Sequence, residues 1–150
     1  MLDLLHMQKT LHWLQKHALY IVLLQAIVAM LGSLYLSDIK GYAPCVLCWY
    51  QRICMYTLVP ILLIGFFRGD EKVYHYVTPI AFVGWLFALY HNLLYTGIFY
   101  AGDSCSFGIS CTTKYVEYFG FITIPLMSFT AFSVILILST IYRRWLRKNS

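Results

Sequence analysis

Charged residues are scarce in this chain of 150 residues. Asp, Glu, Lys and Arg make up 11% of the sequence, hydrophobic residues make up 61%, and the mean hydropathy is +0.70. Soluble domains carry about 25% charged residues. A chain this short cannot hide so much apolar surface in a core of its own. The composition therefore excludes an ordinary soluble domain and indicates a membrane protein.

Internal repeats and low-complexity tracts are also absent, so we expect residues 1–150 to form a single domain. Four stretches with almost no charge lie at residues 18–36, 49–67, 76–96 and 119–142. A membrane-spanning helix needs about 20 residues, and backbone groups in lipid must bond to one another. The sequence therefore predicts an all-α membrane protein, a bundle of four transmembrane helices with two outer loops.

A signal-peptide cleavage site is missing as well. The small residue Ala43, which follows the first apolar stretch, precedes a proline, and no A-x-A-like site is evident. The stretch is also longer than a typical signal-peptide core. We therefore expect the first span to be retained.

The basic residues are unevenly distributed. With Arg52 set aside, eight lie before the first span, between the second and third, or after the fourth, and two lie on the other side. The eight are Lys9, Lys16, Arg68, Lys72, Arg143, Arg144, Arg147 and Lys148; the two are Lys40 and Lys114. Positive residues gather on the cytoplasmic side of membrane proteins. Both termini should therefore be cytoplasmic, and the net charge of +5 does not indicate nucleic-acid binding.

Residues 2–16 precede the first span and allow two interpretations. Leu4, Met7, Leu11 and Leu14 recur at helical spacing, which suits a short helix on the inner membrane surface. A frayed, solvated tail is the alternative.

The five cysteines fall into three groups. Cys45 and Cys48 lie at the outer mouth of the second span, and Cys105 and Cys111 lie in the long outer loop. Both pairs face the compartment where disulfides persist. Cys54 lies inside the second span, where a free thiol is usually an inert small hydrophobe.

Three kinds of site are compatible with two outer cysteine pairs. Four thiolates could hold zinc, but the five-residue gap in the second pair is a loose match and an oxidising exterior disfavours free thiolates, so we expect no metal. Two disulfides could staple the loops of a non-catalytic membrane scaffold. The pairs could also exchange electrons, and the residues around Cys48 favour this third interpretation.

Two basic residues are expected near Cys48. The positive end of the second helix should acidify the Cys48 thiol, and Arg52 lies one turn deeper on the same face, about 6 Å further into the membrane. His91, near the outer end of the third span, should reach a similar depth, and Asn92 follows it. Arg52 either snorkels to the headgroups or pairs with an anion. Together the basic groups suggest a pocket for a lipid-soluble redox acceptor, which Asn92 could help to orient.

These features occur together in one known family. The stretch "CVLCWYQR", a basic inner turn, a histidine-bearing third span and a two-cysteine outer loop resemble the bacterial disulfide-bond formation family DsbB. The segments "YFGFITIPL" and "AMLGSLYLSDI", and the short spacing of the second cysteine pair, resemble its Gram-positive BdbC branch. The resemblance covers residues 18–142.

The resemblance implies an enzyme of the bacterial cell membrane, a quinone-dependent thiol–disulfide oxidoreductase with its active cysteines outside. Such a protein reoxidises an extracytoplasmic thioredoxin-fold dithiol oxidase of the DsbA or BdbD kind. It passes the electrons to menaquinone or ubiquinone and so supports disulfide formation in exported proteins. Proteins resembling vitamin K epoxide reductase share this logic but order their cysteines differently.

The resemblance also assigns roles to particular residues. Cys45 and Cys48 match the pair linked to quinone, and Cys105 and Cys111 match the pair that oxidises the partner. Arg52 and His91 match quinone-binding positions. Gln51 departs from the pattern, because some relatives have an acid there.

Overall fold

The computed structural model describes residues 2–70, 72–98 and 123–149, and these residues form helices without any strand. The elements are α1 (Leu2–Leu34), the π-helix η1 (Tyr35–Ile39), α2 (Val46–Arg68), α3 (Tyr74–Tyr95) and α4 (Ile124–Asn149). Four segments are long and apolar enough to cross a membrane: His17–Ile39, Val46–Arg68, Tyr74–Tyr95 and Ile124–Arg147. The all-α fold with four potential spans is confirmed. The cytoplasmic location of the termini stays a prediction.

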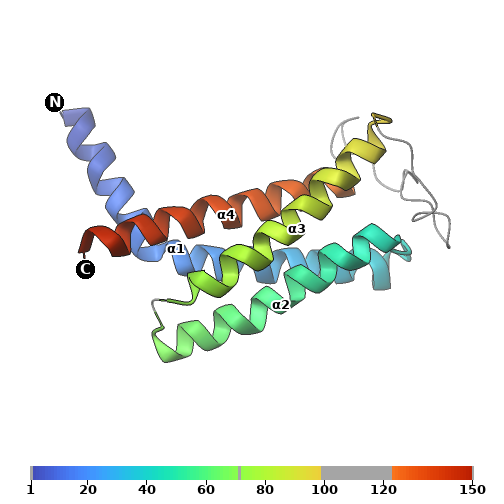
Figure 1. Cartoon of the computed structure of the whole chain (residues 1–150), viewed down its shortest axis with the longest axis horizontal. Coiled ribbons are helices and arrows are strands. Elements are labelled where there is room, and N and C mark those ends of the chain that lie inside the picture. Colours follow the sequence, from blue (N-terminus) through green and yellow to red (C-terminus); the bar gives the residue numbers. More distant parts are fainter. Residues whose placement is uncertain (1, 71, 99–122, 150) are drawn as a thin grey trace.

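The four helices form a bundle in which α1 and α3 each pack against both α2 and α4 (Figure 1). Fully buried side chains such as Leu58, Leu62, Phe132 and Ile135 fill its centre. Large apolar side chains also cover the outside, where Leu24, Ile53 and Phe67 are more than half exposed. An apolar exterior of this kind suits lipid as the surrounding solvent.

The N-terminal segment is helical and continuous with the first span, since α1 runs from Leu2 to Leu34 without a break. Figure 1 shows its first turns leaving the bundle at an angle. The helical interpretation of residues 2–16 is therefore confirmed. Its placement on the inner membrane surface stays a prediction.

The connection between α2 and α3 is short, as the gap between the predicted spans at residues 49–67 and 76–96 indicated. Helix α2 ends at Gly69, whose φ of 62° is left-handed and whose N–H bonds to the Gly65 and Phe66 carbonyls. Glycine adopts this conformation without steric cost, which makes it a common helix terminator. The Asp70 N–H also returns to the Gly65 carbonyl at 2.9 Å, so the chain turns at once toward α3.

The first outer connection is shorter than the gap between the predicted spans. Those spans end at residue 36 and begin again at residue 49, but Ser37–Ile39 belong to the π-helix, which is closed by the Lys40 N–H on the Tyr35 carbonyl at 3.1 Å. The Ser37 hydroxyl donates to the Leu34 carbonyl at 3.2 Å, a local bond that sequence periodicity does not reveal. Gly41, with φ of 70°, then turns the chain toward α2.

Helix α4 begins later than expected. Residues 119–122 of the predicted fourth span lie outside the described residues, and α4 begins at Ile124 with Pro125 in its first turn. A proline is tolerated there because the first N–H groups of a helix have no intrahelical partner. The Pro125 carbonyl accepts a hydrogen bond from Asn92 Nδ2 at 2.9 Å. Asn92 thus ties α3 to α4, and this bond replaces the ligand-orienting role that the sequence suggested.

Gly84 of α3 allows this helix to approach α4 closely. A Cβ atom at this position would overlap the ring of Phe132, which is completely buried. We predict that Gly84→Ala lowers the free energy of unfolding by about 1–3 kcal/mol, because overpacking forces neighbours to move. Thermal unfolding of the purified protein in detergent measures the effect.

Gly32→Ala is the matched control, since a Cβ on this α1 residue meets nothing within 4 Å. It should leave the melting temperature unchanged or raise it slightly, because alanine favours helix. Equal melting temperatures for the two variants would contradict the packing argument.

Candidate redox site

The C-x-x-C motif caps the start of α2. Cys45 is the N-cap residue, with an extended backbone, and its Sγ accepts a hydrogen bond from the Cys48 N–H at 3.4 Å. Both cysteines carry free thiols, and their Sγ atoms lie 3.0 Å apart. At this distance the two sulfurs can share one proton, so the pair is arranged to carry one negative charge.

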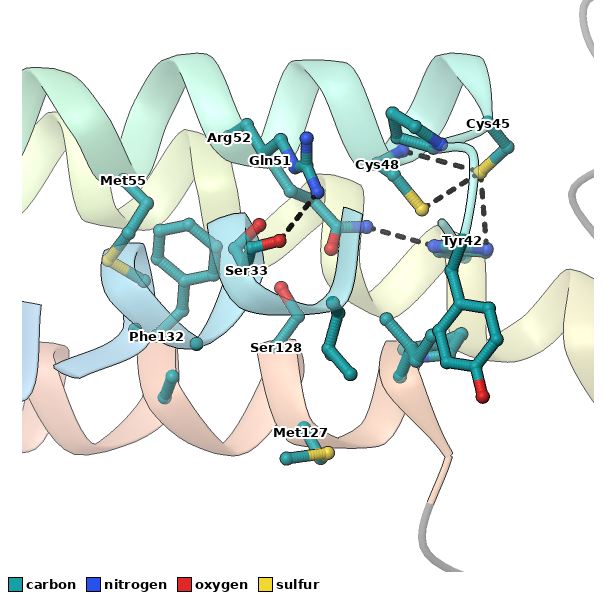
Figure 2. Close-up of a pocket in the computed structure, with 18 of the residues that line it drawn as sticks. Ser33, Tyr42, Cys45, Cys48, Gln51, Arg52, Met55, Met127, Ser128 and Phe132 are labelled. Atoms are coloured by element: carbon teal, nitrogen blue, oxygen red, sulfur yellow. Dashed lines mark hydrogen bonds between the residues drawn. The ribbon is translucent and has the colours of Figure 1, made fainter. Parts of the chain in front are cut away.

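A buried histidine contacts the N-cap sulfur. His91 of α3 is 2% exposed, and its Nε2 lies 3.8 Å from Cys45 Sγ. Its Nδ1 lies 3.1 Å from Nε2 of Gln51, a buried α2 residue. An amide nitrogen can only donate, so Nδ1 accepts and Nε2 carries the proton of the neutral ring. This network therefore directs an N–H of His91 at Cys45 (Figure 2).

The surroundings of Cys45 stabilise its thiolate. Its pKa is lowered to about 4, first by the hydrogen bond with the Cys48 thiol and then, against the opposing effect of burial, by His91 and the Cys48 N–H. The sequence analysis expected Cys48 to be the acidified thiol, and that expectation was wrong for the reduced pair. The reason is positional, because the N-cap side chain meets the unpaired N–H groups of the first turn.

Arg52 reaches across to α1. Its Nη2 donates to the Ser33 carbonyl at 2.9 Å, and its guanidinium carbon lies 5.7 Å from the centre of the Trp49 ring. A guanidinium has five N–H donors, so donors beyond this bond can serve the cavity that Arg52 lines. Pairing of Arg52 with an anion and contact with the headgroups both stay predictions.

All four described residues of the predicted site line one cavity of about 460 Å³ (Figure 2). Its walls come from α1, η1, the connection into α2, and α2, α3 and α4. Apolar side chains form much of the wall, among them Val28, Leu36, Met55, Met127, Ala131 and Phe132. Polar groups enter from all four long helices, among them Gln25 and Ser33 from α1, Gln51 and Arg52 from α2, His91 and Tyr95 from α3, and Ser128 from α4. The cavity suits a flat, mostly apolar ligand with a few polar atoms.

The remaining cysteines are Cys54, Cys105 and Cys111. Cys105 and Cys111 lie outside the described residues. Cys54 packs against the hydrophobic core of the bundle. Its position agrees with the apolar surroundings expected for an inert thiol.

Two cavity residues were missed by the sequence analysis. Gln51 was noted only as a departure from the family pattern, because its contact with His91 depends on how α2 and α3 pack. Tyr56 had a readable signal, since Cys48, Arg52 and Tyr56 recur every four residues and so share one helical face.

A metal remains chemically possible at this site. The ligand atoms of Cys45, Cys48 and His91 all lie within 4.8 Å of one another. Structural zinc sites almost always have four protein ligands, and the described residues group three here. The sequence analysis disfavoured zinc, and this cluster keeps the alternative open.

Comparison with known proteins places the chain in a family. Residues 15–142 match the family model described as "Disulfide bond formation protein DsbB". Disulfide bond formation protein C of Bacillus subtilis is 46% identical over 120 residues, which are 79% of this chain and 87% of the relative. A probable disulfide formation protein C of Halalkalibacterium halodurans is 45% identical over 122 residues, 81% of this chain and 89% of the relative.

A third relative, probable disulfide formation protein C 2 of Bacillus cereus, is 41% identical over 128 residues, which are 85% of this chain and 92% of the relative. No solved structure matches the chain. The family match and these identities confirm the resemblance seen in the sequence. The chain therefore belongs to the DsbB family of disulfide bond formation proteins.

Proposed function

We propose that this multi-pass membrane protein oxidises the dithiol of a thioredoxin-fold thiol oxidase outside the membrane and passes the electrons to a membrane quinone. The observation that carries the proposal is the convergence of a C-x-x-C pair, a buried imidazole and a guanidinium on one largely apolar cavity. Membership of the disulfide-formation family supports the thiol chemistry. The cavity supports a lipid-soluble electron acceptor.

The donor set of the cavity fits a quinone. Arg52 has N–H donors beyond its bond to Ser33 and lines the cavity together with the cysteines, and the apolar wall suits a ring and its lipid tail. A quinone held there would supply the capacity to take up two electrons and two protons.

The chain's own residues would then act as a relay. The partner's dithiol reduces the Cys105–Cys111 disulfide and leaves with a disulfide of its own. The new thiols reduce the Cys45–Cys48 disulfide in the same way, through mixed disulfides formed by thiolate attack. Two electrons and two protons leave the second pair for the acceptor, which re-forms the Cys45–Cys48 disulfide. Each turn oxidises one dithiol.

The residues around Cys45 contribute most to the relay by stabilising one thiolate. The Cys48 N–H and the His91 Nε2–H both point to Cys45 Sγ, so the reduced pair holds its charge there while Cys48 retains the proton. These groups lower the cost of a thiolate at the membrane edge, and a thiolate is the reactive form of cysteine.

The direction of the relay depends on topology. We propose that both termini are cytoplasmic and that both cysteine pairs lie on the outer side, as the distribution of basic residues predicts. The partner would then meet the Cys105–Cys111 pair in the oxidising compartment.

Loss of the Cys48 thiol should stop the relay. Cys48→Ser should abolish quinone reduction, because the C-x-x-C disulfide can no longer form. Purified protein is mixed with quinone and a reduced thioredoxin-fold protein, and the loss of quinone absorbance is followed. Cys54→Ala, a change outside the cavity lining, should turn over normally. Undiminished activity of the Cys48 variant would overturn the proposed function.

Arg52 should matter for use of the acceptor. Arg52→Ala should raise the KM for quinone about tenfold, since a hydrogen bond to a charged group contributes about 1.5–3 kcal/mol. Arg52→Lys keeps the charge but loses the planar fork, so its KM should lie between those of wild type and Arg52→Ala. Steady-state kinetics measures both. Thiol trapping should show that the disulfides form in each variant. Normal quinone kinetics in Arg52→Ala would exclude a role of Arg52 in use of the quinone.

The Cys45 thiolate should depend on Gln51. In the reduced protein the ultraviolet absorbance of a thiolate should be present above about pH 5, because the pKa of Cys45 is about 4. The absorbance should be lost as the pH falls through about 4. Gln51→Leu frees His91 to adopt the other tautomer, so the transition should move to higher pH by the part of the lowered pKa that His91 contributes. Cys45→Ser should remove the low-pH transition. A profile that Gln51→Leu leaves unmoved would contradict the tautomer assignment.

A further inference from the structure

The side chains of Cys45, Cys48 and His91 form a cluster of metal-ligand atoms at one end of the cavity. Each offers one ligand atom, and the three atoms all lie within 4.8 Å of one another. Thiolate sulfur and imidazole nitrogen are the ligands that Zn²⁺ and similar soft cations prefer. The hydrogen bond between Gln51 of α2 and His91 of α3 holds the two sides of the cluster together. The ligand set is therefore assembled by the fold itself.

The spacing of these atoms is close to that of a tetrahedral zinc site. Zinc–sulfur bonds of about 2.3 Å and a zinc–nitrogen bond of about 2.0 Å place two sulfurs about 3.8 Å apart, and sulfur and nitrogen about 3.5 Å apart. Nε2 of His91 lies 3.8 Å from Cys45 Sγ, and the two sulfurs lie 3.0 Å apart. An ion therefore requires the sulfurs to separate by about 0.8 Å. Cys48 lines the cavity, which gives its side chain room for this movement.

Only the reduced pair can offer these ligands. The sequence disfavoured zinc because an oxidising exterior removes free thiolates, and that argument holds for the disulfide. Both cysteines carry free thiols in the structure, and the proposed relay regenerates this dithiol in every turn. The objection from the sequence therefore does not apply to the reduced phase.

Gln51 can support His91 as a metal ligand. A cation takes the lone pair of Nε2, so the ring proton moves to Nδ1, which lies 3.1 Å from the Gln51 amide nitrogen. The amide also has an oxygen that accepts, so turning it over matches the new tautomer. Metal-binding histidines almost always donate their other N–H to such a partner. The imidazole stays neutral, and its orientation is kept.

We propose that the reduced site captures a thiophilic divalent cation such as Zn²⁺ through Cys45, Cys48 and His91. The cation displaces the proton that the two sulfurs share, the proton goes to solution, and no electron moves. Two thiolates and a divalent cation together carry no net charge, which lowers the cost of the complex at the membrane edge. Because all three ligands line the cavity, a water molecule there can fill the fourth position, an arrangement typical of open zinc sites.

A bound cation would also inhibit the relay, and this consequence rests on the proposed function. Both sulfurs of the pair would be engaged in metal bonds, so they could not re-form the disulfide while the ion is bound. In wild type, Zn²⁺ should slow quinone reduction and a chelator should restore it. Quinone reduction that Zn²⁺ leaves unchanged would overturn this consequence.

Equilibrium dialysis against Zn²⁺ tests the site itself without any turnover. The full chain carries Cys105→Ser and Cys111→Ser, so that these thiols supply no ligands, and is kept in detergent without oxygen. After reduction and removal of the reductant it should bind about one equivalent of Zn²⁺. The same protein with the Cys45–Cys48 disulfide formed should bind at least about tenfold more weakly. With Cd²⁺ as the probe, the reduced protein should gain the ultraviolet absorbance of thiolate–metal charge transfer.

His91→Phe removes one ligand and keeps an aromatic ring. Loss of an outer-shell partner alone costs about 10–100-fold in metal affinity, so this variant should bind at least about tenfold more weakly than its parent. His75→Phe is the matched control, because His75 is an exposed residue of α3 that contacts the Lys72 carbonyl. It should bind Zn²⁺ as the parent does. Cys45→Ser leaves α3 unchanged and should weaken binding as well, which covers the case that His91→Phe does not fold.

Each outcome bears on the inference or on the proposed function. Equal affinity of the reduced and oxidised proteins would place the ion elsewhere and overturn the inference. Undiminished binding by a folded His91→Phe, or by Cys45→Ser, would overturn the three-ligand site. A reduced protein that binds no Zn²⁺ overturns the inference, while quinone reduction without added metal is unaffected. If the site binds Zn²⁺ but wild type reduces no quinone in the absence of metal, the proposed function is overturned and the site stands.

Discussion

The structure of the site depends on the exposed N–H groups at the start of α2. A helix that begins at the edge of a membrane leaves its first N–H groups without backbone partners, and in this chain a sulfur fills the N-cap position. One interaction thus closes the helix, orients Cys45 toward His91 and stabilises a thiolate. The second cysteine of the motif follows one turn later and faces the same cavity. Capping and redox chemistry share the same atoms.

Much of the fold could be predicted from the sequence because a membrane imposes strong constraints. The lack of charge gave the four spans, and the boundaries of the second and third differ from the structure by at most three residues. The remaining differences between the predicted and observed spans have local causes. Ser37 extends α1 into a π-helix, and Pro125 marks the start of α4 where an interior position was expected. Neither effect alters hydrophobic composition, so composition could not reveal it.

The site was predictable where it followed helical periodicity and not where it followed packing. Cys48 and Arg52 share a face by their spacing, and depth alone brought His91 to the same level. The assignment of the thiolate to Cys45 required the N-cap geometry, and the role of Gln51 required the contact between α2 and α3. The bond of Arg52 to the Ser33 carbonyl joins two helices, and spacing within α2 cannot indicate it.

The bond between Arg52 and Ser33 has a consequence for the balance of charge through a reaction cycle. In the proposed cycle the reduced pair carries a thiolate, and the guanidinium of Arg52 lines the same cavity. When the thiols become a disulfide the negative charge disappears and the guanidinium stays. The Ser33 carbonyl of α1 and the Trp49 ring contact the guanidinium independently of the thiols. These contacts would therefore hold the charge of Arg52 in place in both oxidation states.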